Sequence, residues 1–122
     1  MFTLNKILGT KYPIMQGGMA NIATGEFAAA ISNAGALGII GAGGMDADTL
    51  QKNIRRCKEL TQKPFGVNIM LMSREVEKKA QIVAEEGVAV VTTGAGNPGV
   101  YVPMWQEAGI KIIPVVSAVA LA

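Results

Sequence analysis

The sequence contains no histidine and a single cysteine, Cys57. Without an imidazole the chain lacks the commonest general base and the commonest zinc ligand. A lone cysteine forms no intramolecular disulfide, so a reducing compartment, the cytoplasm, is the expected location. Cys57 continues the helical spacing of Leu50 and Ile54, which favours a packing role over a nucleophilic one.

Charge is also scarce, because only 16% of the residues are charged and the net charge is +2. That balance gives no support to a nucleic-acid or membrane partner. The densest basic stretch, Lys52, Arg55, Arg56 and Lys58, shares a helix with an apolar stripe; we interpret it as a solvated face in preference to a phosphate-binding patch. The apolar runs fall short of the ~20 residues that a membrane-spanning helix needs, and no secretory signal is recognised.

Apolar residues make up 50% of the chain, an unusual share for so few charges. A small free-standing domain needs proportionally more polar surface than this. We therefore expect an incomplete structure that covers apolar surface with a partner, and a homo-oligomer is the expected form.

Short apolar runs alternate with amphipathic segments at a nearly regular interval. The runs begin near Ile14, Leu37, Phe65, Ala89 and Lys111. Several of them are apolar on successive residues, as is typical of parallel strands covered on both faces. The pattern predicts four strand–helix units and a fifth strand within one domain, residues 1–122. Periodicity leaves two architectures open: a doubly wound sheet, or somewhat more than half of a (β/α)8 barrel.

The connecting segments carry helix start signals. Thr24 is a candidate N-cap for the first helix, Asp46 or Asp48 for the second, Ser73 precedes the third, and Pro103 is predicted in the first turn of the fourth. The last six residues, 117–122, have the pattern of a fifth helix beginning.

Glycine-rich segments follow the predicted strands, at the edge where α/β proteins bind ligands. These segments are residues 16–20, 41–44 and 92–98. Each could be an ordinary tight turn, and residues 41–44 match a dinucleotide fingerprint only weakly. The chain has no Walker lysine pattern, no cluster of metal ligands and no catalytic triad, so we predict no metal site and no catalytic residue in it.

Asn68 is a polar amide inside the apolar run of residues 65–71. A buried amide without partners costs roughly 1–3 kcal/mol, so it needs a hydrogen-bonding role. Two roles remain open from the residues alone: contact with the polar edge of a flavin ring, or a bond to neighbouring backbone.

Four segments together resemble the FMN-dependent enoyl-acyl-carrier-protein reductase II family, within the nitronate monooxygenase (2-nitropropane dioxygenase) superfamily. They are YPIMQGGMA at 12–20, AGALGII at 34–40, KPFGVNIML at 63–71 and VVTTGAGNP at 90–98. The resemblance implies the N-terminal part of a TIM-type (β/α)8 barrel that binds FMN. It also implies NAD(P)H-dependent reduction of a trans-2-enoyl thioester on acyl-carrier protein, in bacterial fatty-acid synthesis.

By position, the resemblance places Gly18, Met19 and Ala20 against the flavin ring and Asn68 at its polar edge. It places Thr93, Gly94 and Ala95 near the ring or the acyl pocket. The family's catalytic histidine and phosphate-binding loops have no counterpart in residues 1–122, so we expect this chain alone to be inactive and to retain FMN weakly or not at all. The alternatives are a nitronate monooxygenase and a non-catalytic half-barrel that associates with itself.

Overall fold

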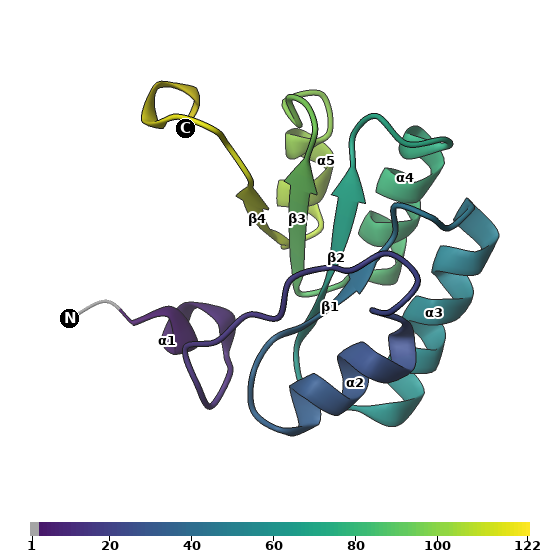
Figure 1. Ribbon diagram of the computed structural model, residues 1–122, viewed down its shortest axis with the longest axis vertical. Coiled ribbons are helices and arrows are strands. Elements are labelled where there is room, and N and C mark those ends of the chain that lie inside the picture. The colour runs from purple at the N-terminus through teal and green to yellow at the C-terminus, as the bar shows by residue number, and fades with distance from the viewer. Residues whose placement is uncertain (1–2) are drawn as a thin grey trace.

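Four parallel strands form a single sheet in the computed structural model, which describes residues 3–122 (Figure 1). The strands are β1 (Gly38–Gly41), β2 (Phe65–Met70), β3 (Val90–Gly94) and β4 (Lys111–Pro114), and they lie side by side in chain order. Each neighbouring pair is parallel, as in the register Asn68 opposite Thr92. All four carboxyl ends therefore meet at one edge of the sheet.

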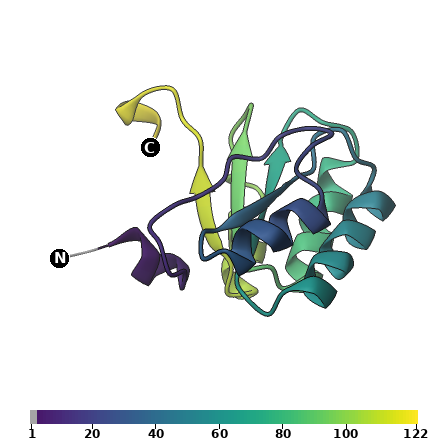
Figure 2. The same ribbon diagram turned by 60° about the horizontal axis from the view of Figure 1, so that its bottom comes forward.

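Helices cover one face of this sheet. They are α2 (Gly25–Asn33), α3 (Ala47–Leu60), α4 (Val76–Glu86) and α5 (Val102–Glu107). All four contribute to one apolar core with the strands, and Figure 2 shows α2, α3 and α4 side by side. A doubly wound sheet has helices on both faces and a reversal of strand order. Successive units that turn the same way are instead those of a (β/α)8 barrel, so the predicted fold class, the N-terminal part of such a barrel, is confirmed.

Two of the predicted helix starts have the expected side-chain caps. The Thr24 hydroxyl accepts a hydrogen bond from the Phe27 amide at 3.3 Å, and the Asp46 carboxylate accepts one from Thr49 at 2.7 Å. Helix α4 begins differently, because Glu75 precedes it in a left-handed conformation (φ 56°). Ser73 makes no cap and instead donates its hydroxyl to the Met70 carbonyl at 2.6 Å.

The first predicted strand, near Ile14, is reduced to one parallel bridge between Met15 and Leu37. The next residue, Gln16, hydrogen-bonds to β1 through its side chain, where a strand would use its backbone. Its amide donates to the Ile39 carbonyl at 3.1 Å and accepts from the Ile39 amide at 2.8 Å. The segment is therefore held at the β1 edge without continuing as a strand.

The face away from the α2–α5 layer has its own small core. The short helix α1 (Leu4–Leu8), which the sequence analysis did not predict, contributes Leu8, which packs with Leu37, Ile39 and Val90. At the other end of the chain, the expected fifth helix is a short 3-10 helix, η1 (Val119–Leu121). Helices α1 and η1 lie on the same side of the molecule in Figure 1.

The basic stretch on α3 is exposed, as predicted, and it also ties α3 to α4. Arg55 and Lys58 bind the Glu86 carboxylate at 3.0 Å and 3.1 Å. Cys57 is fully buried, and burial raises the pKa of its thiol to about 12, so it is a packing residue with little thiolate at neutral pH. No helix in residues 3–122 has the length and apolar character needed to cross a bilayer.

Candidate functional site

A pocket of about 450 Å³ lies at the carboxyl ends of β1 and β2. Its walls come from three loops and from the strand ends between them. The lining residues are Gly18, Ala20, Gly41, Gly43, Gly44, Asn68, Met70, Met72 and Ser73. Three of the four predicted cofactor-binding residues, Gly18, Ala20 and Asn68, are therefore brought together at one pocket.

Asn68 occupies the face of β2 that points away from the helices. Its strand neighbours Val67 and Ile69 belong to the helix-side core, so alternation places Asn68 on the opposite face, where it is half-buried. Its side-chain oxygen accepts a hydrogen bond from the Thr92 hydroxyl at 2.8 Å. The side chain thus bonds to a neighbouring side chain, and not to the backbone as one of the two sequence interpretations held.

Gly18 lies directly against Asn68. A Cβ atom placed on Gly18 would come within 2.8 Å of the Asn68 Cβ, closer than real side chains pack. Glycine at this position therefore lets the loop approach the amide and leaves its surface flat. A flat surface beside an amide is the kind of surface that a planar heterocycle requires.

The loop of residues 17–20 passes over the end of β1. A Cβ atom on Gly41 would lie 2.8–2.9 Å from the Met19 backbone, so the two backbones are in direct contact. Met19 contributes its backbone to this packing, and its partly exposed side chain is not part of the pocket wall. The predicted role of Met19 against a ring thus remains a prediction.

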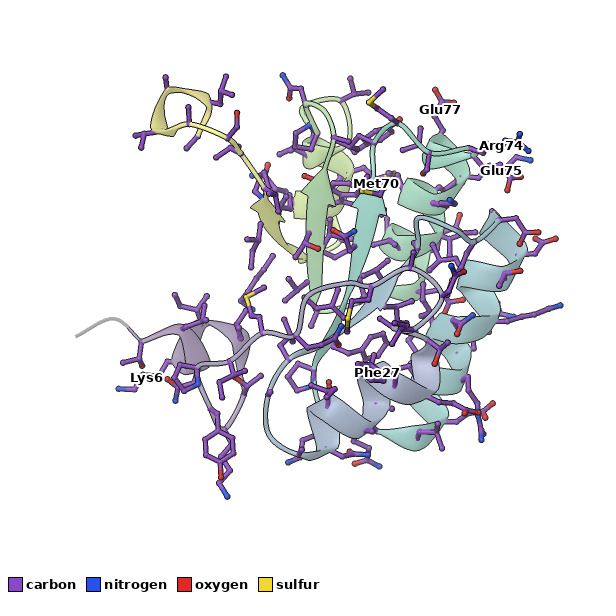
Figure 3. The ribbon with its side chains drawn as sticks, in the orientation of Figure 1. Lys6, Phe27, Met70, Arg74, Glu75 and Glu77 are labelled. Atoms are coloured by element: carbon purple, nitrogen blue, oxygen red, sulfur yellow. The ribbon has the colours of Figure 1, made fainter. Side chains whose placement is uncertain are left out.

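A buried lysine connects the two remaining loops of the pocket. Lys79 on α4 is 1% exposed, and its ammonium donates to the Ala42 carbonyl at 3.1 Å and to the Ser73 hydroxyl at 3.4 Å. Ala42 follows β1 and Ser73 follows β2, while Met70, labelled in Figure 3, lies at the end of β2. One cation therefore links the loop after β1 to the loop after β2.

Burial lowers the pKa of Lys79 from its usual value, while the charges of Glu75 and Asp46 oppose that shift. Glu75 stands at the amino end of α4 (Figure 3) and accepts a hydrogen bond from the Ala47 amide at 2.9 Å. The same loop after β2 is thus held both to Ala42 and to the start of α3. The sequence analysis missed this role of Lys79, since a lysine in an amphipathic helix ordinarily lies on the solvated face.

A larger pocket, of about 730 Å³, lies at the carboxyl ends of β3 and β4. Its lining comes from residues 95–99, Val102, residues 114–117, Leu121 and Ala122. Ala95 is among them, but Gly94 and Thr93 are not. Thr93 is 1% exposed and has the same strand parity as Val91 of the helix-side core, so its side chain points toward the helices.

Thr92, which the sequence analysis did not single out, is the threonine that contacts Asn68. The residues that line the two pockets carry no titratable side chain within residues 3–122. These walls therefore provide shape and hydrogen bonds, and neither provides a side-chain acid or base. The described residues also contain no cluster of three or more side chains suited to a metal ion.

Comparison with known proteins adds a family to this geometry. The model of the nitronate monooxygenase family matches residues 2–82. The chain is 47% identical to FabK from Thermotoga maritima, with a TM-score of 0.94 over 97% of this chain and 38% of that one.

Two curated relatives have different described activities. An octahydro-1H-indene-4-carboxyl-CoA dehydrogenase of Mycobacterium tuberculosis is 32% identical over 94% of this chain and 32% of its own length. A probable nitronate monooxygenase of Staphylococcus saprophyticus is 48% identical over 55% of this chain and 19% of its own length. The chain thus spans less than two fifths of the length of each relative.

Proposed function

The chain belongs to the nitronate monooxygenase family, and on that premise we propose that it forms the flavin-ring side of an FMN-dependent oxidoreductase. The reaction proposed is the NAD(P)H-dependent reduction of the carbon–carbon double bond of a trans-2-enoyl thioester carried by acyl-carrier protein. The observation that supports it best is the pocket in which Gly18 lies directly against the Asn68 side chain. The 47% identity to FabK over nearly the whole chain favours this branch of the family.

The residues of the smaller pocket fit the ring of FMN better than its phosphate. Gly18 and Ala20 leave a surface without bulky side chains, and Asn68 offers an amide to a polar ring edge. FMN, when bound, supplies the hydride transfer chemistry, while the protein supplies orientation and electrostatics. Lys79 holds the loops after β1 and β2 together and so keeps the pocket wall in place.

A chimera tests the reaction. Residues 1–122 replace the matching 38% of FabK from Thermotoga maritima, and the flavin content of the purified protein is measured first. We expect bound FMN and NADH oxidation that depends on a crotonyl thioester. A chimera with Asn68→Ala serves as the control and is expected to lose most of its flavin. Full flavin loading without thioester-dependent oxidation would reject the reductase assignment.

The second candidate is nitronate oxidation. It is favoured by the family model and by the 48% identity to the staphylococcal protein over 67 residues. This activity consumes oxygen with a nitronate and needs no NAD(P)H. The same flavin-loaded chimera separates the two candidates, because oxygen uptake with propyl-2-nitronate and no reaction with the crotonyl thioester supports only the second.

A further inference from the structure

Asn68 and Thr92 are direct partners across two neighbouring strands. They face each other in the register of β2 and β3, and both side chains lie on the face away from the helices. The Thr92 hydroxyl, in a residue only 7% exposed, donates to the Asn68 oxygen at 2.8 Å. The bond is therefore largely shielded from water, where a hydrogen bond has more orienting power than at the surface.

The direction of this bond in the structure gives the orientation of the amide, because a threonine hydroxyl can donate or accept and here it donates to the Asn68 oxygen. An asparagine side chain has an accepting oxygen at one end and an NH₂ group with two donors at the other. The oxygen is taken by Thr92, and within residues 3–122 no group accepts a hydrogen bond from the Asn68 Nδ2. That nitrogen lies toward Gly18, 3.5 Å from the position that a Cβ on Gly18 would occupy. The donor end therefore faces the Gly18 wall of the pocket.

We propose that Thr92 is a positioning residue that makes Asn68 a hydrogen-bond donor to the ligand of this pocket. The ligand atom at Asn68 is then an acceptor, such as a ring carbonyl oxygen or an unprotonated ring nitrogen, and not an N–H group. A flavin ring offers both kinds of edge, so Thr92 selects how the ring is oriented. The identity of the ligand rests on the proposed function, whereas the orientation of the amide does not.

Thr93 provides a matched control. It is the adjacent threonine, it is also buried, and its side chain points to the opposite face, where its hydroxyl has no hydrogen-bond partner within residues 3–122. Thr92→Val and Thr93→Val each replace a buried hydroxyl with a methyl group of similar size. Thr92→Ser retains the hydroxyl and tests for rescue.

The first measurement needs no flavin. It records, in the 122-residue chain, the nuclear Overhauser effects between the Asn68 side-chain NH₂ protons and the Gly18 α-protons. We expect these signals in the unchanged chain, in Thr92→Ser and in Thr93→Val, and a loss of at least half their intensity in Thr92→Val. Equal intensities in Thr92→Val and Thr93→Val, with both variants folded by backbone shifts, would overturn the proposal.

The second measurement titrates FMN into the flavin-free FabK chimera, in which residues 1–122 are unchanged or carry one of these substitutions, and follows the fluorescence of the flavin. Thr92→Val is expected to raise the dissociation constant about tenfold, the equivalent of one oriented hydrogen bond. Thr92→Ser and Thr93→Val are expected to stay within about twofold of the unchanged chain. Equal affinity in Thr92→Val and Thr93→Val would contradict the positioning role.

A methylated analogue tests the donor assignment. FMN methylated at N3 lacks the ring N–H, so the effect of Thr92→Val should be the same for both flavins if Asn68 donates to an acceptor. An effect confined to unmodified FMN would show that Asn68 accepts from the ring and would overturn the proposal. Absence of any flavin binding by the FabK chimera, with the Overhauser pattern of the 122-residue chain as expected, would instead reject the proposed function and leave the Thr92–Asn68 orientation intact.

Discussion

The two faces of the four-stranded sheet differ most at the carboxyl ends of the strands. On the helix-covered face the strands contribute Ile40, Val67, Ile69 and Val91 to one apolar core. On the other face, the carboxyl ends of the strands carry glycine and the Asn68–Thr92 pair. Both faces belong to the same strands, so alternation along each strand separates the residues that stabilise the fold from those that form the pocket.

This difference predicts that the two faces tolerate different substitutions. The helix-covered face depends on volume, because close-packed side chains leave no room for water and little for rearrangement. The pocket face depends on the absence of side chains, since Gly18 and Gly41 let backbone segments meet. A substitution that removes a large side chain should therefore be most harmful on the first face, whereas around the pocket the harmful substitution is one that adds atoms to Gly18 or Gly41.

The largest expected effect is on the helix side. Trp105 is fully buried, and its ring N–H donates to the Ala80 carbonyl at 3.0 Å, which joins α5 to α4. Trp105→Ala should lower the free energy of unfolding by about 3–5 kcal/mol, because it leaves a large cavity and removes the hydrogen bond to Ala80. Urea unfolding measures this. Trp105→Phe, which retains much of the volume, should cost clearly less; equal losses would mean that packing is not the cause.

The next effect tests added atoms on the pocket face. Gly41→Ala places a methyl group against backbone atoms of Met19, which cannot move aside as the end of a flexible side chain could. The substitution should therefore lower the free energy of unfolding by about 1–3 kcal/mol. Gly17→Ala is the matched control, because its Cβ would meet no atom within 4 Å and should change stability by less than about 0.5 kcal/mol. The same urea experiment compares them. Similar losses in both variants would contradict the close-contact explanation.

The parts of the fold that follow from periodicity were predictable from the sequence. The apolar runs at Phe65, Ala89 and Lys111 became β2, β3 and β4, and the caps at Thr24 and Asp46 formed. The run at Ile14 did not become a strand, because the Gln16 side chain takes up the hydrogen bonds of Ile39. A pattern of apolar residues does not show where a side chain, in place of the backbone, makes the hydrogen bonds to a neighbouring strand.

The site was predictable where an unusual residue stood inside a regular pattern. Asn68 was recognisable because an amide interrupts an apolar strand, and the structure places it with Gly18 and Ala20 at one pocket. Thr92 and Thr93 are adjacent and chemically identical, so only the strand register reveals which of them faces Asn68. Lys79 was missed because its partners, Ala42 and Ser73, are distant in the chain.

Lys79 is an exception on the helix side, since it is a charge among buried apolar groups. Because burial lowers its pKa, the unfolded chain binds more protons between that lowered pKa and 10.5, the usual value. The free energy of unfolding should therefore rise with pH through this window and be lowest on its acidic side. Unfolding curves of the unchanged chain and Lys79→Met, measured from pH 7 to 10.5, isolate this effect by their difference.

In Lys79→Met the rise assigned to Lys79 should be absent, and the stability at pH 7 should differ by about 1 kcal/mol or less. Methionine removes the cost of burying a charge but also removes the hydrogen bonds to Ala42 and Ser73, and leaves the Ala42 carbonyl with only the Met45 amide as donor, so the two effects oppose each other. Parallel curves for the two proteins over the whole range would mean that Lys79 titrates as it does in the unfolded chain.

The smallest expected effect lies at the outer seam between α3 and α4, farthest from the pocket face. Burial alone would raise the pKa of Glu86, but hydrogen bonds from Lys58 and Arg55 outweigh it and the pKa is lowered. Glu86→Gln should cost less than about 1 kcal/mol at pH 7, because both partners are largely exposed. This contribution is present above pH 4.5 and is lost as the pH falls through the lowered pKa. Glu85→Gln is the control, since within residues 3–122 the Glu85 carboxylate makes no ion pair and accepts a hydrogen bond from Gln81. The cost at Glu86 should shrink in 1 M salt while that at Glu85 stays near zero.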